Sequence, residues 1–183
     1  RPSLVGARAA RSASMSEIGK RKDDHLDLAA RGDVGFHQTT TLFEAIRFVH
    51  DALPELCADE IDTSQKVLGK VLRAPILIAG MTGGTDRARA INQELAKLAQ
   101  ARGYAFGLGS QRAMHKDATV GESYQVRDVA PDVLLFGNVG LVQAARMPSE
   151  EVAELARAVG ADAMCLHLNP AQEAVQPGGD RDF

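Results

Sequence analysis

The stretch Pro75-Ile76-Leu77-Ile78-Ala79-Gly80-Met81-Thr82-Gly83-Gly84 decides the fold, because a short apolar strand runs directly into a glycine-rich loop. The same arrangement recurs three times, with apolar runs that begin at Ala105, Val133 and Ala163. Counted from Ile76, successive runs are 29, 28 and 30 residues apart. Such a repeat holds a strand, a loop, a helix and a return, so it predicts parallel strands joined by helices.

The segments between these strands carry helical patterns. Apolar residues spaced by about 3.6 positions predict helices over Ala88–Ala101 and Glu150–Val159, and a weaker helix between Gly121 and Ala130. Upstream, the same spacing predicts a helix over Leu42–Leu53 that Pro54 ends.

A small hairpin is expected before the first repeated strand. Residues Ile61–Leu72 alternate in β-type side chains around Leu68-Gly69-Lys70, which has the composition of a tight turn.

Two folds fit parallel strands in this order, a (β/α)₈ barrel and a doubly wound sheet. Four near-equal units without a Gly-x-Gly-x-x-Gly fingerprint favour the TIM barrel. A barrel needs about eight strands, so we expect residues 20–183 to form the first half of one barrel domain, after a disordered tail over residues 1–19. Half a barrel would expose strand edges, and we therefore expect the sequence to be part of a longer protein.

Composition excludes several classes of function. The 183 residues carry a net charge of −3, which argues against a nucleic-acid partner. No apolar run approaches the ~18 residues of a membrane span. Cys57 and Cys165 are too few for a disulfide framework, so we expect reduced thiols and a cytoplasmic protein.

Polar side chains follow every predicted strand. Ser110-Gln111-Arg112 follows the second strand, Gly137-Asn138-Val139-Gly140 is predicted as a loop after the third, and His167 and Asn169 share one face of the fourth. Ligands bind at the carboxyl ends of parallel strands, so these groups predict a site. A lone His167 also suits a satisfied core position, but Asn169 and the following Gln172-Glu173 favour the site.

The run Lys20-Arg21-Lys22-Asp23-Asp24-His25 has two interpretations. A dense charged run is usually a solvated helix start. Three cations beside a histidine also suit a polyanion such as a diphosphate.

Six motifs, in order and in spacing, resemble the type 2 isopentenyl-diphosphate isomerase family. They cover the chain from about Lys20 to Phe183: Arg21-Lys22-Asp23-Asp24-His25, Met81-Thr82-Gly83-Gly84, Gly109-Ser110-Gln111-Arg112, Gly137-Asn138-Val139-Gly140, His167 to Glu173, and Gly179-Asp180-Arg181-Asp182-Phe183.

The resemblance implies an enzyme of isoprenoid biosynthesis that interconverts isopentenyl and dimethylallyl diphosphate. It implies a (β/α)₈ barrel with reduced FMN, Mg²⁺, and NADPH as the reductant that keeps the flavin reduced. Members of the family are usually cytosolic homo-oligomers, often tetramers or octamers.

The resemblance also implies roles for matching residues. Substrate binding is implied for Arg21, Lys22, His25, Arg112, His167, Asn169 and Gln172. Flavin contacts are implied for Met81, Thr82, Gly83, Ser110 and Asn138. Glu173 resembles the Mg²⁺ ligand, and Gln172 resembles the catalytic residue near the reacting carbons.

The expected chemistry suits these residue types. Moving a double bond adds a proton at one carbon and removes another two carbons away. An amide is a poor acid or base, so proton transfer is assigned jointly to the flavin and Gln172. Two alternatives remain open: another FMN-dependent TIM-barrel oxidoreductase of the α-hydroxy-acid oxidase type, and a truncated, non-catalytic barrel scaffold.

Overall fold

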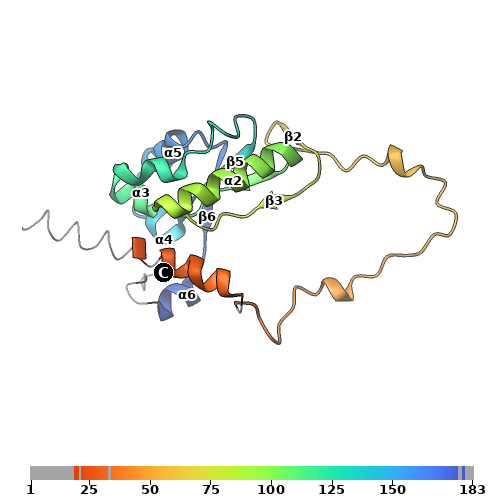
Figure 1. The fold of residues 1–183 in the computed structure, drawn as a ribbon, viewed down its shortest axis with the longest axis horizontal. Helices are drawn as coiled ribbons and strands as arrows, with labels where there is room; N and C mark the ends of the chain where they lie inside the picture. The colour runs from red at the N-terminus through yellow and green to blue at the C-terminus, as the bar shows by residue number, and fades with distance from the viewer. Residues whose placement is uncertain (1–18, 21, 33, 177–178, 180–183) are drawn as a thin grey trace, which may run out of the picture.

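Four parallel strands form a sheet whose spatial order is the order of the chain. In the computed structural model, which describes residues 19–20, 22–32, 34–176 and 179, these strands are β3 (Leu77–Ile78), β4 (Ala105–Gly107), β5 (Leu134–Gly140) and β6 (Ala163–His167). Each strand pairs in parallel with the next. The predicted parallel strands are therefore confirmed, within a mixed α/β fold (Figure 1).

Strand β5 is longer than predicted, and the expected loop at Gly137-Asn138-Val139-Gly140 is wrong. These four residues continue the strand and pair with residues 164–167 of β6. Asp162 fixes that register, because its N–H donates to the Leu135 carbonyl at 2.8 Å and its carboxylate accepts from the Leu135 N–H at 2.8 Å. Backbone pairing outweighs the low strand propensity of two glycines.

Helices α2 (Asp86–Arg102) and α5 (Ser149–Ala158) cover one face of the sheet, together with the shorter α3 (Arg112–Lys116) and η3 (Ala118–Tyr124). Two more short helices, α4 (Leu141–Ala144) and α6 (Pro170–Val175), follow directly after β5 and β6. The core lies between this layer and the strands, where Ala96 and Ala99 of α2 pack with Phe106 of β4 and Leu155 of α5.

The predicted helices α2 and α5 are confirmed, each within two residues at either end. Thr85 caps α2 by accepting a hydrogen bond from the Ala88 N–H at 3.1 Å. The helix predicted between Gly121 and Ala130 is wrong, since a 3₁₀ helix ends at Tyr124 and turns follow it. Val126 and Ala130 are fully buried there, so their apolar spacing reflects core packing without a helix.

The predicted hairpin is confirmed as β1 (Gln65–Val67) and β2 (Lys70–Leu72). Leu68 and Gly69 form its two-residue turn, both with positive φ, at 47° and 83°. That geometry is a turn of the kind that matches the twist of antiparallel strands.

The helix predicted over Leu42–Leu53 is wrong. Only the short 3₁₀ helices η1 (Phe43–Ala45) and η2 (Ala58–Glu60) occur in a long excursion that leaves the body of the molecule (Figure 1). Phe48 and Val49 are 93% and 98% exposed, so the apolar stripe has no surface to pack on among the described residues. A helix of this length depends on such packing for its stability.

A further helix spans residues 22–31, and its side chains contact the start of α2. The tail predicted over residues 1–19 lies outside the described residues except for Gly19, which is helical. Within the described part of the chain, no helix combines the length and apolar character that crossing a membrane requires.

Candidate functional site

The strand ends and the N-terminal helix enclose a cavity of about 320 Å³. Ten residues singled out from the sequence line it: Lys22, His25, Met81, Ser110, Arg112, Asn138, His167, Asn169, Gln172 and Glu173. They come from five separate segments of the chain, and they meet because the strands are parallel and in order. Arg21 lies outside the described residues.

His167 and Asn138 form the polar floor of the cavity. They lie on neighbouring strands, and His167 Nδ1 is 2.7 Å from Asn138 Oδ1. The amide oxygen accepts, so Nδ1 carries the proton and Nε2 is left as an acceptor. Burial lowers the pKa of the imidazole, and the nearby Glu173 carboxylate opposes that shift. The His167 imidazole is therefore neutral when the cavity is empty, and a bound anion would favour its protonated form.

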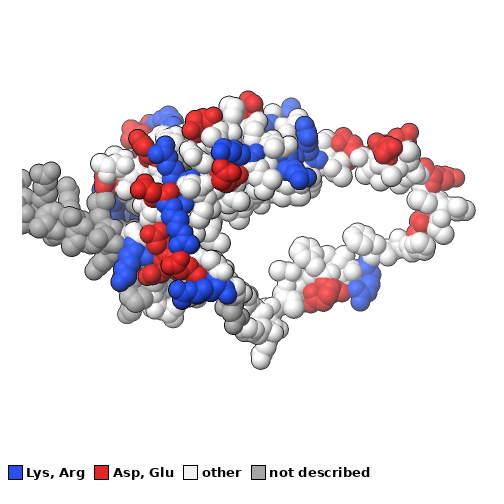
Figure 2. Space-filling model, viewed as in Figure 1, with Lys and Arg blue, Asp and Glu red and all other residues white. Residues whose placement is uncertain are grey.

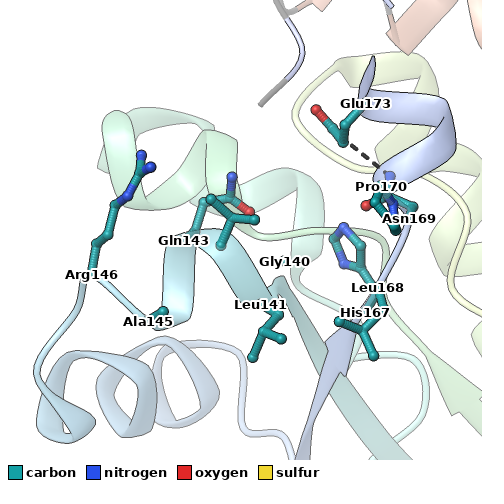
Figure 3. A pocket seen from close by; sticks show the side chains of 11 residues that line it. Gly140, Leu141, Gln143, Ala145, Arg146, His167, Leu168, Asn169, Pro170 and Glu173 are labelled. Atoms are coloured by element: carbon teal, nitrogen blue, oxygen red, sulfur yellow. Dashed lines mark hydrogen bonds between the residues drawn. The ribbon is translucent and has the colours of Figure 1, made fainter. Parts of the chain in front are cut away.

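A second hollow of about 430 Å³ opens beside the first (Figure 3). The two share Gln143, His167, Asn169 and Glu173. The other walls of the second hollow are mainly apolar, from Leu141, Val142, Ala145, Leu168 and Pro170. The site thus places a polar compartment directly beside an apolar one.

The short helix α6 presents the carboxylate. Asn169, its N-cap, donates from Nδ2 to Glu173 Oε1 at 3.2 Å, as the dashed line in Figure 3 shows. Gln172 precedes Glu173 and lines the same cavity. Asn169 therefore does not continue the face of β6, which ends at His167, and its amide instead orients the carboxylate.

The N-terminal helix brings basic groups over the strand ends. Asp23 accepts from Thr85 Oγ1 at 3.1 Å, and Asp27 accepts from Arg87 at 2.5 Å. Lys22 and His25, from the same helix, line the cavity. Figure 2 shows acidic and basic side chains side by side where this helix meets α2. Within the charged run, Lys20 and Asp24 are exposed, as a solvated helix start predicts, whereas Lys22 and His25 line the cavity; the binding of a polyanion there stays a prediction.

The loop after β3 supplies one wall. Met81 lines the cavity and is 74% exposed, while Thr82 and Gly83 are buried and do not line it. Thr82 Oγ1 is buried without a hydrogen-bond partner among the described residues. Such an orphaned hydroxyl is unusual in a folded core and marks a place where a ligand atom would be stabilised.

Three contributors to the site were not predicted. Gln143 and Gln176 line the cavity, and Gln176 Nε2 lies 3.2 Å from His25 Nε2. Tyr124 is buried beneath it and bonds to Ser110 and Lys22. Gln143 follows a strand end, which is a usable signal, whereas the contacts of Gln176 with His25 and of Tyr124 with Lys22 join residues more than a hundred positions apart.

Comparisons with known proteins show which family and which proteins the chain is similar to. Residues 15–170 match the model of the FMN-dependent dehydrogenase family. The chain is 46% identical over 170 residues to the isopentenyl-diphosphate delta-isomerase of Xanthobacter autotrophicus, which covers 92% of this chain and 50% of that protein. The proteins of the same name from Synechocystis sp. and Methanosarcina mazei are 48% and 45% identical, over 91% and 92% of this chain and 48% and 46% of theirs.

The chain therefore spans about half the length of these curated relatives. Its match to the family model nevertheless covers most of its residues, including the strands and loops that build the cavity. The chain belongs to the FMN-dependent dehydrogenase family.

Proposed function

We propose that this chain supplies half of an enzyme that interconverts isopentenyl diphosphate and dimethylallyl diphosphate in isoprenoid biosynthesis. One observation carries the proposal: Lys22, His25, Arg112 and His167 line one small cavity together with a single carboxylate, Glu173. Basic and imidazole groups around one acid suit a diphosphate that arrives with a metal ion. The names of the similar proteins support the same reaction.

The proposed fold of the whole protein is a (β/α)₈ barrel. A parallel sheet in chain order, with helices on one face and the polar groups at the carboxyl ends of its strands, is how such a barrel begins. This chain would contribute about the first four βα units and the N-terminal helix.

The residues present fit a flavin. Met81, Ser110 and Asn138 line the cavity, and the orphaned Thr82 hydroxyl is buried in the loop that follows Met81. A reduced flavin, when bound, supplies an electron-rich ring that stabilises positive charge on a neighbouring substrate. Met81, Ser110 and Asn138 would hold that ring, with Thr82 and Gly83 shaping the loop behind it.

Glu173 fits Mg²⁺. Hard cations take oxygen ligands, and Mg²⁺ commonly combines one or two carboxylates with substrate phosphates. Among the described residues no group of three or more potential metal ligands exists, so the phosphate oxygens would complete the coordination. Lys22, His25, Arg112, His167 and Asn169 would bind the remaining diphosphate oxygens.

Gln172 is proposed to lie against the reacting carbons. Gln172 lines the cavity and directly precedes Glu173, the proposed metal ligand, in the chain. A substrate whose diphosphate is bound at that metal would therefore lie close to the Gln172 side chain. Its amide would orient the substrate, and a bound flavin would supply the acid–base chemistry that an amide lacks. We expect Gln172→Glu to change turnover and solvent isotope exchange strongly; unchanged values for both would exclude a direct role.

The remaining proposals concern the setting of the enzyme. NADPH is proposed to keep the flavin reduced, and the protein is proposed to be a cytoplasmic homo-oligomer, a tetramer or an octamer. Size-exclusion chromatography with light scattering measures the oligomer directly.

The deciding experiment incubates the complete enzyme that contains this chain with FMN, NADPH, Mg²⁺ and isopentenyl diphosphate. We expect dimethylallyl diphosphate to form without net consumption of NADPH. An α-hydroxy-acid oxidase, which the family description allows, would instead reduce its flavin with a hydroxy acid. If no product forms and no flavin binds, the result supports the non-catalytic scaffold.

A further inference from the structure

Tyr124 is a fully buried residue that the proposed chemistry does not use, yet it contacts three parts of the site. It ends η3 and has no exposed surface. Its hydroxyl donates to the Ser110 carbonyl oxygen at 2.8 Å and accepts from Lys22 Nζ at 2.9 Å. These two bonds connect the end of β4 to the N-terminal helix.

The ring of Tyr124 supports the loop after β3. A Cβ added at Gly83 would lie 2.1 Å from Tyr124 Cε1, so the glycine backbone rests directly on the ring edge. Lys22 Nζ lies 5.4 Å from the ring centroid but only 2.9 Å from the hydroxyl oxygen, so it lies beyond the hydroxyl end of the ring. The hydroxyl is therefore the part of Tyr124 that binds the ammonium group, while the ring supports the loop.

The hydroxyl can serve both neighbours only while it keeps its proton. A phenol donates one hydrogen bond and accepts others, whereas a phenolate cannot donate to a carbonyl. Burial raises the pKa of Tyr124, which keeps the phenol neutral near neutral pH. The two hydrogen bonds that join Tyr124 to Ser110 and Lys22 therefore persist near neutral pH.

We propose that Tyr124 is a positioning residue that aims the Lys22 ammonium at the anionic end of a ligand in the cavity. A lysine has a flexible four-carbon stem, and ordering it at the moment of binding weakens affinity. The Tyr124 hydroxyl orders it beforehand, at the wall that Lys22 shares with Ser110 and Arg112. This inference rests on the proposed diphosphate function of the cavity.

The test measures binding of inorganic pyrophosphate with Mg²⁺ to the full chain by calorimetry, in a double-mutant cycle of Tyr124→Phe and Lys22→Met. Tyr124→Phe removes only the hydroxyl and leaves the ring against Gly83. We expect pyrophosphate affinity to fall about three- to tenfold. In the Lys22→Met background the same substitution should have no further effect, because Tyr124 acts through Lys22.

Tyr104→Phe is the matched control, since Tyr104 is the other tyrosine of the chain and lies at the opposite end of β4. It should leave pyrophosphate affinity unchanged. Hydrogen exchange across residues 22–31 is a second readout, and it should speed up in both Tyr124→Phe and Lys22→Met. Exchange that is unchanged in Lys22→Met would overturn the inference even if Tyr124→Phe failed to fold.

Equal losses of affinity from Tyr124→Phe in both backgrounds, or no loss in either, would also overturn it. So would a Lys22→Met protein that binds pyrophosphate as well as the wild type, even if isomerase activity were present. Coupled losses in a protein without isomerase activity would support the positioning role and reject the proposed reaction.

Discussion

Replacing Asp162 by alanine should destabilise the fold without touching the site. Asp162 lies just before β6, at the amino-terminal end of the strands, opposite the cavity. Its Oδ2 accepts hydrogen bonds from three donors. These are Lys70 Nζ at 2.9 Å, Arg127 Nη2 at 2.9 Å and the Leu135 N–H at 2.8 Å. One carboxylate thus joins the hairpin, the segment after η3 and the start of β5.

The magnitude follows from the burial of these donors. Leu135 is fully buried, and leaving its N–H without an acceptor costs about 1–3 kcal/mol. The Lys70 and Arg127 side chains are 32% and 23% exposed, so solvent screens both pairs and each contributes at most about 1 kcal/mol. We expect Asp162→Ala to lower the free energy of unfolding by about 2–4 kcal/mol.

Asp162→Asn is the control, because its amide oxygen still accepts from the Leu135 N–H. Denaturant unfolding of the full chain should rank wild type, Asp162→Asn and Asp162→Ala in falling stability, with equal pyrophosphate affinities. An Asp162→Ala protein as stable as wild type, or one no less stable than Asp162→Asn, would refute the reasoning.

Acid adds a second check on Asp162. Burial would raise the pKa of this carboxyl, but the hydrogen bonds from Leu135, Lys70 and Arg127 outweigh burial and hold it below its ordinary value of 3.8. A lowered pKa in the folded state stabilises the fold above pH 3.8, and that stabilisation is lost as the pH falls through the folded value. The stability difference between wild type and Asp162→Asn should therefore shrink below about pH 4.

Three further predictions concern the site. Gly83→Ala should lower the free energy of unfolding by about 1–3 kcal/mol, since its methyl group would overlap the Tyr124 ring; denaturant unfolding measures it, and a neutral result would show that the ring moves aside freely. His167→Gln should remove a pH dependence of stability. Burial lowers the pKa of His167, so the wild type loses stability as the pH falls through 6.5 toward the folded value, and the glutamine variant should lose less between pH 7 and 5; parallel curves would contradict this. Glu173→Gln should weaken Mg²⁺-dependent pyrophosphate binding about tenfold while leaving metal-free binding unchanged, which calorimetry with and without Mg²⁺ resolves; equal losses in both conditions would exclude a metal ligand.

The sequence predicted the sheet well because repeat spacing is a global signal. Four apolar runs about 29 residues apart leave room for a helical return each time, whatever the details of the loops. The site followed from the sheet, since the carboxyl ends of parallel strands meet at one edge and bring Ser110, Asn138 and His167 together.

Local patterns were less reliable, for physical reasons that differ from one segment to another. The periodicity of Leu42–Leu53 describes a helix only if a surface receives its apolar stripe, and none does among the described residues. The glycines at 137 and 140 suggested a loop, but pairing with β6 holds them in a strand. Tyr124 gave no signal, because its importance lies in long-range contacts to Lys22 and Ser110.

The agreement between strand order and chain order has a consequence for how the protein folds. Each new strand pairs with the one made about thirty residues earlier, so each step closes a loop of similar length at a similar entropic cost. The sheet can therefore grow one strand at a time as the chain leaves the ribosome. The N-terminal helix can meet Thr85 and Arg87 as soon as the start of α2 is made, but its contact with Gln176 spans 151 residues, so that wall of the cavity closes only after β6 is in place.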